Sequence, residues 1–379
     1  MTINTLYLLY YPGRGGTEEY VYSLATSLPG DFRPLLAYGR PGPLVERWRQ
    51  AGLAAFHVPM RHPLDPLAVY RLARLMAREG VRVTHSNFLR ENFLGALASR
   101  LAGVPVVVNT VHMLEPPPPP VALANRVMSR LWDGVIAVSE AVARQVLAQG
   151  LPAEKVRVIL NGVRLERFEV GGSRQQAREG FGLGGNELVI GSVGRLAPEK
   201  GFDVLLEAAA VAASRLHRPL RVLIAGDGPC RAQLEEQARR LRLGPKVLFV
   251  GHYQDIPRAL AALDLFVLPS RHEACSLALL EALAAGVPVI ASRTGGNAEV
   301  IGDSGAALLV APGRADELAD AICLLAADPE LRQRLGRLGR ERALNFSLER
   351  MVRETAQLYL ELLERKGGHP QRGGPLPRA

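Results

Sequence analysis

The chain has 379 residues, 48% of them hydrophobic and 22% charged, which is an ordinary balance for a globular protein and leaves room for two domains. No apolar run reaches the ~20 residues of a membrane-spanning helix, which argues against an integral membrane protein. The net charge of +9 favours acidic or anionic partners, but no nucleic-acid motif accompanies it, and we expect no nucleic acid as a ligand.

Charge and cysteine placement predict the compartment. The part of the chain before residue 171 holds 19 basic and 13 acidic residues, so most of the excess positive charge lies there and suits an anionic membrane. Cys230, Cys275 and Cys323 are far apart and lack metal-ligand spacing. The start, MTINTLYLLYYPGRGG, lacks the features of a signal peptide. We therefore expect a cytoplasmic protein and leave peripheral contact with the inner face of the membrane open.

Strands and helices are predicted to alternate through the first half. Helical patterns occur at 17–28, 45–50 and 67–79. The alternation predicts a parallel sheet in a Rossmann-like domain. Short apolar runs indicate its strands at 3–10, 33–38, 54–58, 81–86, 104–109, 135–138 and 156–160.

Two polar features follow strands of this first domain. Gly15 and Gly16 precede the first helix, where small residues let a phosphate or sugar approach the backbone, and Thr17 is the expected helix cap. The alternative is a simple tight turn. His85 and His112 lie at or just after strand ends, where a lone histidine is more often structural than functional.

The second half begins with a Gly-rich, polar stretch at 169–186 that is typical of a linker. A last helix is expected after Ser347, and the Gly/Pro/Arg-rich tail at 366–379 is expected to be disordered. We therefore predict two Rossmann-like α/β domains, over 1–170 and 171–346. Strands of the second domain are indicated at 188–193, 221–225, 247–250, 265–268, 287–291 and 307–310.

Loops with cations and glycines follow the strands of the second domain. Arg195 and Lys200 lie in GSVGRLAPEKG, just before a helix that starts near Phe202. Two cations beside a helix N-terminus suit a diphosphate, although a salt-bridged loop is the alternative. The segment 226–229, GlyAspGlyPro, is predicted to be a turn after the next strand.

The stretch at 265–296, LFVLPSRHEACSLALLEALAAGVPVIASRTGG, predicts a strand, a loop, a helix, a turn and a second strand. Ser276 is the expected helix cap and Gly286 the expected helix stop. Glu273 lies in the loop and Glu281 in the helix, and each alone could be merely solvated. Because the helix is strongly apolar, we expect it to be buried. A buried carboxylate needs a partner, and a sugar or ribose hydroxyl is a suitable one.

These motifs resemble the retaining glycosyltransferases of family 4, which have the GT-B fold of two Rossmann-like domains facing each other across a cleft. Glu273 and Glu281, separated by seven residues and followed by AlaAlaGlyValProVal, match the family's Glu-x7-Glu signature. The segment GSVGRLAPEKG matches a second signature. The resemblance covers nearly the whole chain but is sharp only in the second half. It implies that the last helix, 347–365, returns to the first domain.

The resemblance also implies roles for particular residues. Glu273 would contact the donor sugar, Glu281 would hold the ribose of the nucleotide, and His112 would lie near the sugar. Cations and backbone N–H groups would stabilise the diphosphate as it leaves. The implied catalytic residues are Arg195, Lys200, Glu273 and His112, and the implied donor-binding residues are Gly15, Gly16, Gly194, Gly226, Gly228, Ser276, Leu277 and Glu281.

The implied reaction moves a sugar, with retention of configuration, from a nucleoside-diphosphate sugar to a glycan or lipid-linked acceptor of the cell envelope, such as a lipopolysaccharide or exopolysaccharide. A UDP-sugar is the expected donor. We expect no cofactor and no metal, because no Asp-x-Asp pair or His/Cys cluster lies beside the site. The alternatives are a non-catalytic nucleotide-sugar-binding subunit, or an epimerase or hydrolase of nucleotide sugars on the same fold. Without a ligand, Glu273 and Glu281 are expected to be unpaired.

Overall fold

The computed structural model describes residues 2–115, 118–168 and 173–367. Its contacts divide the chain into two compact units, which we call the N-terminal unit (Met1–Asn161 with Leu348–Ala379) and the C-terminal unit (Gly162–Ser347). The predicted boundary at 170 falls among residues outside the described ones, as does most of the predicted disordered tail. Within the described ranges, no helix is both long and apolar enough to cross a membrane.

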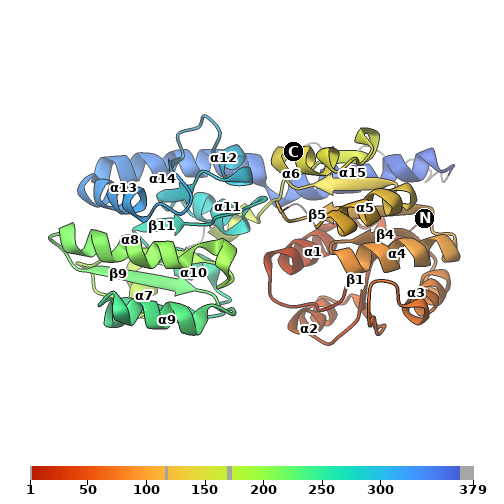
Figure 1. Cartoon of the computed structure of the whole chain (residues 1–379), viewed down its shortest axis with the longest axis horizontal. Helices are drawn as coiled ribbons and strands as arrows, with labels where there is room; N and C mark the ends of the chain where they lie inside the picture. The colour runs from red at the N-terminus through yellow and green to blue at the C-terminus, as the bar shows by residue number, and fades with distance from the viewer. Residues whose placement is uncertain (1, 116–117, 169–172, 368–379) are drawn as a thin grey trace. The chain divides into compact units, whose positions relative to one another are not determined.

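The N-terminal unit is built on a parallel sheet of seven strands (Figure 1). The strand order is β3-β2-β1-β4-β5-β6-β7, so the order reverses between β1 and β4. In open α/β sheets, ligands bind at the carboxyl ends of the strands beside such a reversal. The strands are β1 (Ile3–Leu9), β2 (Phe32–Tyr38), β3 (Ala54–His57), β4 (Val81–Ser86), β5 (Val106–Val111), β6 (Gly134–Ala137) and β7 (Val156–Val158).

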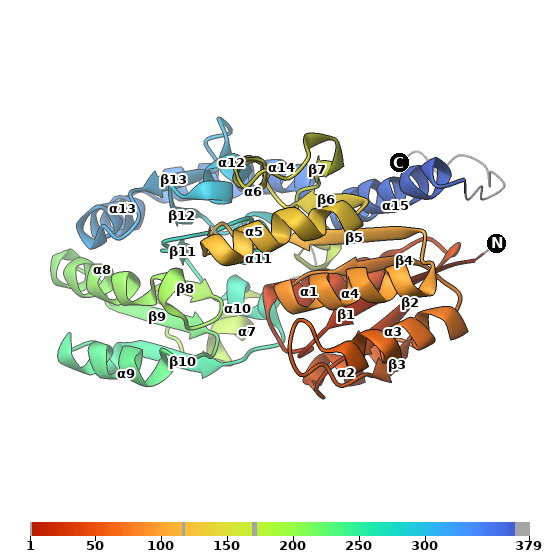
Figure 2. The ribbon, with the colours of Figure 1, turned by 45° about the vertical axis from the view of Figure 1, so that its right-hand side comes forward.

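The last helix, α15 (Leu348–Arg365), belongs to the N-terminal unit although it follows the C-terminal unit in the sequence (Figure 2). Its apolar face buries Met351, Tyr359 and Leu363. The return of this helix, which the resemblance implied, is therefore confirmed.

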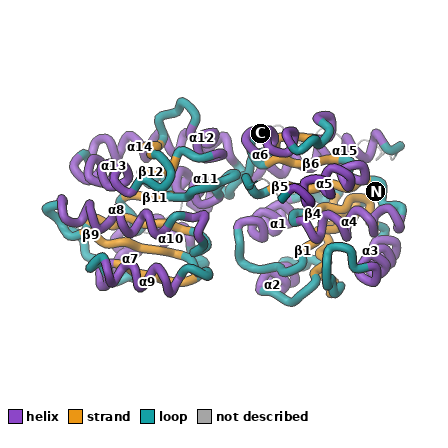
Figure 3. The backbone as a smooth tube through the Cα atoms, viewed as in Figure 1, coloured by secondary structure: helices purple, strands orange, loops and turns teal. Residues whose placement is uncertain are grey.

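Helices cover both faces of the N-terminal sheet (Figure 3). Alternate residues of β1 point to opposite faces, so Tyr7 and Leu9 pack with α1, α2 and α15, while Leu6 and Leu8 pack with α3 and α4. The other helices of the unit are α1 (Gly16–Ser27), α2 (Pro43–Gln50), α3 (Pro66–Arg78), α4 (Leu89–Ala102), α5 (Pro119–Met128) and α6 (Glu140–Ala148).

The C-terminal unit repeats this plan with a parallel sheet of six strands, in the order β10-β9-β8-β11-β12-β13 and with the reversal between β8 and β11. Its strands are β8 (Leu188–Val193), β9 (Leu220–Ala225), β10 (Val247–Gly251), β11 (Leu265–Leu268), β12 (Val289–Ser292) and β13 (Ala307–Val310). Its helices are α7 (Arg174–Glu179), α8 (Phe202–Arg215), α9 (Arg231–Arg240), α10 (Ile256–Ala261), α11 (Leu277–Ala284), α12 (Gly295–Ile301), α13 (Ala315–Ala327) and α14 (Pro329–Ala343).

The ends of two helices test the predicted cap chemistry. The Ser276 hydroxyl accepts a hydrogen bond from the Leu279 N–H at the start of α11, and Gly286 follows the helix with a φ of 69°, so both predictions are confirmed. The predicted cap at Thr17 is wrong. Helix α1 begins at Gly16, and Gly15 occupies the N-cap position without a side chain.

Candidate active site

The predicted site residues of the C-terminal unit gather at the carboxyl edge of its sheet, beside the reversal between β8 and β11. The loop after β8 carries Arg195 and Lys200, and the loop after β11 carries Glu273. Because β8 and β11 are neighbours, these two loops meet. The Lys200 ammonium lies 2.7 Å from a carboxylate oxygen of Glu273.

The Glu273 carboxylate is already paired in the absence of a ligand. Its side chain is 7% exposed, and the Ser270 hydroxyl donates to the same oxygen that binds Lys200, at 2.9 Å. The expectation that Glu273 is unpaired in the empty site is therefore wrong. A carboxylate this deeply buried must find protein partners when no ligand is present, and the loop after the adjacent strand supplies the cation.

An arginine that the sequence analysis did not identify ties the two loops together. The Arg271 guanidinium binds both carboxylate oxygens of Asp203, at 2.8 and 2.6 Å, and donates to the Pro198 carbonyl at 2.9 Å. The Arg271 N–H donates to the Glu199 carbonyl at 2.8 Å. Hydrogen bonding to Arg271 lowers the pKa of Asp203. The loop that carries Lys200 is thus bound to the loop that carries Glu273 at several points.

The second predicted cation, Arg195, lies on the outer side of the same loop. Its guanidinium pairs with Glu199 four residues later, and its side chain is 59% exposed. An exposed pair of this kind contributes little to stability. Arg195 can therefore exchange its carboxylate partner for another anion at low cost.

Two glycines bring the loop after β9 against the loop after β8. A Cβ at Gly226 would lie 1.8 Å from the Gly194 carbonyl oxygen, and one at Gly228 would lie 2.5 Å from the Leu196 carbonyl oxygen. Real Cβ atoms do not approach backbone this closely, so only glycine allows these loops to pack. This close backbone packing shapes the part of the edge where a nucleotide is expected.

Helix α11 begins beside these loops. Ser276 caps it and Leu277 is its first residue, so the N–H groups of its first turn have no partner within the helix. Such an N-terminus favours negative charge. Glu281 lies in the second turn, half-buried between the fully buried Leu280 and Ala282.

In the N-terminal unit, the predicted site residues at the corresponding edge are two glycines and a histidine. Gly15 and Gly16 lie where α1 begins, after β1. His112 directly follows β5, and its Nε2 lies 3.0 Å from the Asn87 side-chain oxygen. The ring of Tyr20 packs against the His112 ring in an edge-on arrangement, with 4.7 Å between the centroids. Burial lowers the pKa of His112 well below its ordinary value. Sequence analysis identified His112 but not Asn87.

His85 has a structural role, as is more common for a lone histidine at the end of a strand. It is 0% exposed, hydrogen-bonds through Nδ1 to the Tyr359 hydroxyl of α15, and lies 2.7 Å from the Thr110 hydroxyl through Nε2. Burial lowers its pKa to about 3, so the imidazole is neutral. His85 therefore connects helix α15 to strands β4 and β5, whose carboxyl ends form part of this edge of the sheet.

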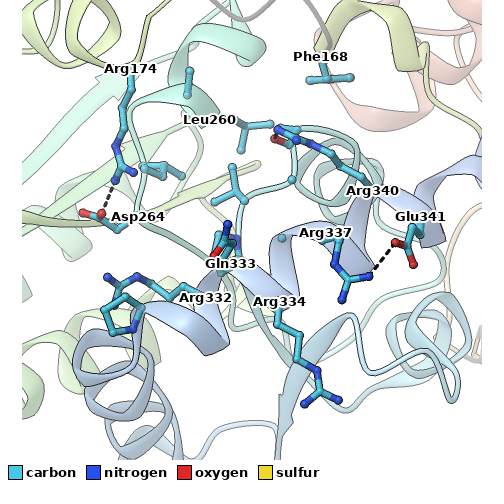
Figure 4. A pocket seen from close by; sticks show the side chains of 18 of the residues that line it. Phe168, Arg174, Leu260, Asp264, Arg332, Gln333, Arg334, Arg337, Arg340 and Glu341 are labelled. Atoms are coloured by element: carbon cyan, nitrogen blue, oxygen red, sulfur yellow. Dashed lines mark hydrogen bonds and ion pairs between the residues drawn. The ribbon is translucent and has the colours of Figure 1, made fainter.

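A large hollow of about 950 Å³ lies at the other edge of the C-terminal sheet (Figure 4). It is lined by the segments that precede β11 and β12, so it lies at their amino ends. Most of the arginines that line it bind backbone carbonyls or carboxylates of the protein. Arg332 donates to the Ala326 carbonyl at the end of α13 at 3.0 Å, Arg340 donates to the Ala285 carbonyl at the end of α11 at 3.2 Å, and Arg174 pairs with Asp264. The predicted site residues do not line this hollow.

Two glycosyltransferase family models match the two halves of the chain. The model of the family "Glycosyl transferases group 1" matches residues 173–342, and that of "Glycosyltransferase Family 4" matches residues 14–167. The chain is 32% identical over 304 residues to a D-inositol 3-phosphate glycosyltransferase of Saccharomonospora viridis, covering 74% of this chain and 70% of the relative. It is 29% identical over 348 residues to the UDP-Gal:alpha-D-GlcNAc-diphosphoundecaprenol alpha-1,3-galactosyltransferase of Escherichia coli, covering 86% and 88%.

The fold matches a solved structure over nearly its full length. Anabaena Alr3699/HepE, solved in complex with UDP-glucose, superposes with a TM-score of 0.82 at 25% identity, covering 96% of this chain and 100% of that one. The two parallel-sheet units with a returning C-terminal helix are therefore the GT-B fold, as predicted. The chain belongs to the family 4 glycosyltransferases and is a sugar-transferring enzyme of that family.

Proposed function

We propose that this enzyme transfers a sugar, with retention of anomeric configuration, from a nucleoside-diphosphate sugar to a glycan or lipid-linked acceptor. One observation supports this most directly. Lys200 and Glu273, which lie 73 residues apart in the sequence, meet at the carboxyl edge beside the start of α11. A cation, a carboxylate and the N-terminus of a helix therefore lie close together, which supports the proposal because a departing diphosphate and its sugar require groups of these kinds.

In the proposed reaction, the acceptor oxygen forms a bond to the anomeric carbon as the bond from that carbon to the diphosphate oxygen breaks. Both events occur on the same face of the sugar, which retains the configuration. The departing phosphate takes the proton of the acceptor hydroxyl. Lys200, Arg195 and the first N–H groups of α11 stabilise the negative charge that develops on the diphosphate. Glu273 holds the sugar, and Glu281 binds the ribose.

A UDP-sugar is the proposed donor and a cell-envelope glycan or lipid-linked sugar the proposed acceptor. The E. coli relative is named for a UDP-Gal donor and a diphosphoundecaprenol-linked acceptor, and the solved Anabaena protein was crystallised with UDP-glucose. The proposal requires no metal and no cofactor. Within the described ranges, no group of three or more His, Cys, Asp or Glu side chains is arranged to hold a metal ion.

Donor screening provides the test. Purified protein is mixed with UDP-glucose, UDP-galactose, UDP-N-acetylglucosamine or GDP-mannose, and the unfolding temperature and the release of nucleoside diphosphate are measured with and without excess EDTA. We expect one donor to stabilise the protein and to be turned over in EDTA. Proton NMR of the product should show the anomeric configuration of the donor. Inversion, or a strict requirement for manganese, would contradict the mechanism.

Variants separate transfer from mere binding. Arg195→Ala and Lys200→Ala should each lower kcat/KM by about 10²–10³, the scale of losing one preorganised charge-stabilising group. Arg334→Ala is the matched control, since Arg334 is an exposed arginine of the same unit that lines the hollow at the amino edge. Binding without any turnover would support the alternative of a non-catalytic subunit. Turnover to free sugar or to an epimerised nucleotide sugar alone would support a hydrolase or epimerase.

A further inference from the structure

The turn that carries Lys200 is short and is held in place from outside. It is a single 3₁₀ turn over Pro198–Lys200, in the loop after β8. One such turn makes few hydrogen bonds of its own, so its position depends on its contacts. The carbonyls of its first two residues, Pro198 and Glu199, both accept hydrogen bonds from Arg271, at 2.9 Å from the guanidinium and at 2.8 Å from the backbone N–H. Arg271 therefore holds the turn that presents Lys200.

The residue after Lys200 also contacts the loop after β11. A Cβ at Gly201 would lie 2.2 Å from the Pro269 carbonyl oxygen, and Gly201 has a φ of 65°. Only glycine combines this conformation with so close an approach. The backbone is therefore held against the loop after β11 both before and after Lys200.

Arg271 is itself held by two further elements. Its guanidinium binds both carboxylate oxygens of Asp203, in the first turn of α8, at 2.8 and 2.6 Å, which fixes its orientation. Its carbonyl accepts from the Thr294 hydroxyl, after β12, at 3.1 Å. The Arg271 and Asp203 side chains are 36% and 38% exposed, so water screens the pair and its contribution to stability is small. What the pair supplies is a fixed geometry.

We propose that Arg271 is a positioning residue for sugar transfer, which fixes Lys200 relative to Glu273 through the turn over Pro198–Lys200. The inference rests on the proposed function, because Lys200 acts there on the departing diphosphate. A cation stabilises developing charge most when it is already in place, so its position matters more in the transition state than in the ground state. Arg271 acts through Lys200 and needs no contact with the substrate.

Transfer kinetics separate positioning from a general structural role. Arg271→Ala should lower kcat/KM by about 10- to 100-fold, because misplacing a catalytic group by about 1 Å can cost this much. In the Lys200→Ala background the same substitution should cost less than about three-fold, because the group that Arg271 positions is gone. Arg271→Lys keeps the charge but loses the two-pronged geometry, and should restore only part of the activity. Equal losses in the two backgrounds would overturn the proposal.

Arg215→Ala is the matched control. Arg215 is a half-exposed arginine at the other end of α8, and it also pairs with an aspartate of the same unit, Asp320, at 2.6 Å. Its removal should leave kcat/KM unchanged. If the wild type transfers a sugar while Arg271→Ala matches Arg215→Ala, the positioning role is refuted and the proposed function stands.

Lysine labelling tests the same role without any donor. The chain has four lysines, so mass spectrometry after brief exposure to an amine-reactive reagent gives the labelling rate of Lys200 and, as an internal reference, that of the exposed Lys246. Arg271→Ala should raise the rate at Lys200 by about five-fold, the change expected when its pair with Glu273 opens more easily by about 1 kcal/mol, and leave Lys246 unchanged.

Glu273→Gln, which removes the partner of Lys200, gives the labelling rate of the unpaired lysine. An unchanged rate at Lys200 in Arg271→Ala would overturn the positioning role, whether or not a sugar is transferred. A raised rate in a protein that transfers no sugar would instead retain the contact between Arg271 and the turn while the proposed function fails.

Discussion

The ion pair between Lys200 and Glu273 makes a quantitative prediction about the ligand-free enzyme. At 2.7 Å, and with an effective dielectric constant of about 20, the attraction between the two charges is about 6 kcal/mol before the cost of removing them from water is subtracted. Removing one partner of a fully buried pair costs about 3–5 kcal/mol. Because the Lys200 side chain is 25% exposed, water screens the pair, and we expect Lys200→Met to lower the free energy of unfolding by about 2–3 kcal/mol.

A double-mutant cycle isolates the coupling of this pair. Glu273→Gln keeps the shape of the side chain and removes its charge, so the combined variant Lys200→Met/Glu273→Gln leaves no unpaired buried charge. Its loss of stability should be at least about 1 kcal/mol smaller than the sum of the two single losses. In urea unfolding, far-UV circular dichroism follows both units, whereas the fluorescence of Trp48 and Trp132, which both lie in the N-terminal unit, follows that unit alone. The part of the dichroism change that the fluorescence does not share therefore reports the C-terminal unit.

Lys246→Met is the control for the loss of a lysine, since Lys246 is exposed and lies in the same unit. It should change the free energy of unfolding by less than about 0.5 kcal/mol. Additive losses in the cycle, to within about 0.5 kcal/mol, would refute the reasoning. They would mean that the pair is not formed in the ligand-free protein.

Three further predictions follow from the geometry. His85 has a pKa of about 3 in the folded protein and about 6.5 in the unfolded chain, so between these pH values only the unfolded chain binds the proton. Below pH 6.5 the free energy of unfolding of the wild type should therefore fall by about 1.4 kcal/mol per pH unit relative to that of His85→Gln. Tryptophan fluorescence in urea measures it, and the same pH dependence of stability in both proteins would contradict the prediction. Gly226→Ala should weaken UDP binding by at least about ten-fold because its Cβ would force the Gly194 carbonyl to move, whereas Gly244→Ala, where the nearest atom is 3.9 Å away, should not. Glu281→Gln should mainly raise the KM for the donor, whereas Glu273→Gln should mainly lower kcat; the reverse pattern in steady-state kinetics would show that the two roles are exchanged.

Features that depend on short stretches of sequence were predictable. The strand β11, the cap at Ser276 and the stop at Gly286 each follow from a few adjacent residues whose chemistry favours one local conformation. The placement of Arg195 and Lys200 between a strand and a helix follows in the same way. The observed N-cap of α1, Gly15, lies two positions before the predicted cap, because Thr17 is a good cap residue but the two glycines before it already provide the turn.

The partners of the site residues were not predictable, because they come from distant parts of the chain. Lys200 and Glu273 are 73 residues apart, Arg271 and Asp203 are 68 apart, and Asn87 and His112 are 25 apart. Only the order of the strands brings these residues together, and a single sequence contains no direct signal for that order. An Asn immediately after one strand and a His immediately after the next was the available clue for the last pair, since both strand ends lie on one edge of a parallel sheet.

The two units use the same topology for different chemistry, and the difference is what the proposed reaction requires. The edge of the C-terminal unit relies on charges, with Lys200 bound to Glu273 and Arg195 bound to Glu199. In the proposed function, a bound diphosphate would compete with these carboxylates for the cations. In the proposed reaction, Glu273 would then be available to accept a hydrogen bond from a hydroxyl of the sugar that the same diphosphate carries. The edge of the N-terminal unit relies on neutral hydrogen bonds around His112, which no change of charge in the diphosphate disturbs. The charges of one unit and the neutral hydrogen bonds of the other can therefore vary independently, so substitutions at Asn87 should leave the affinity for the nucleotide intact.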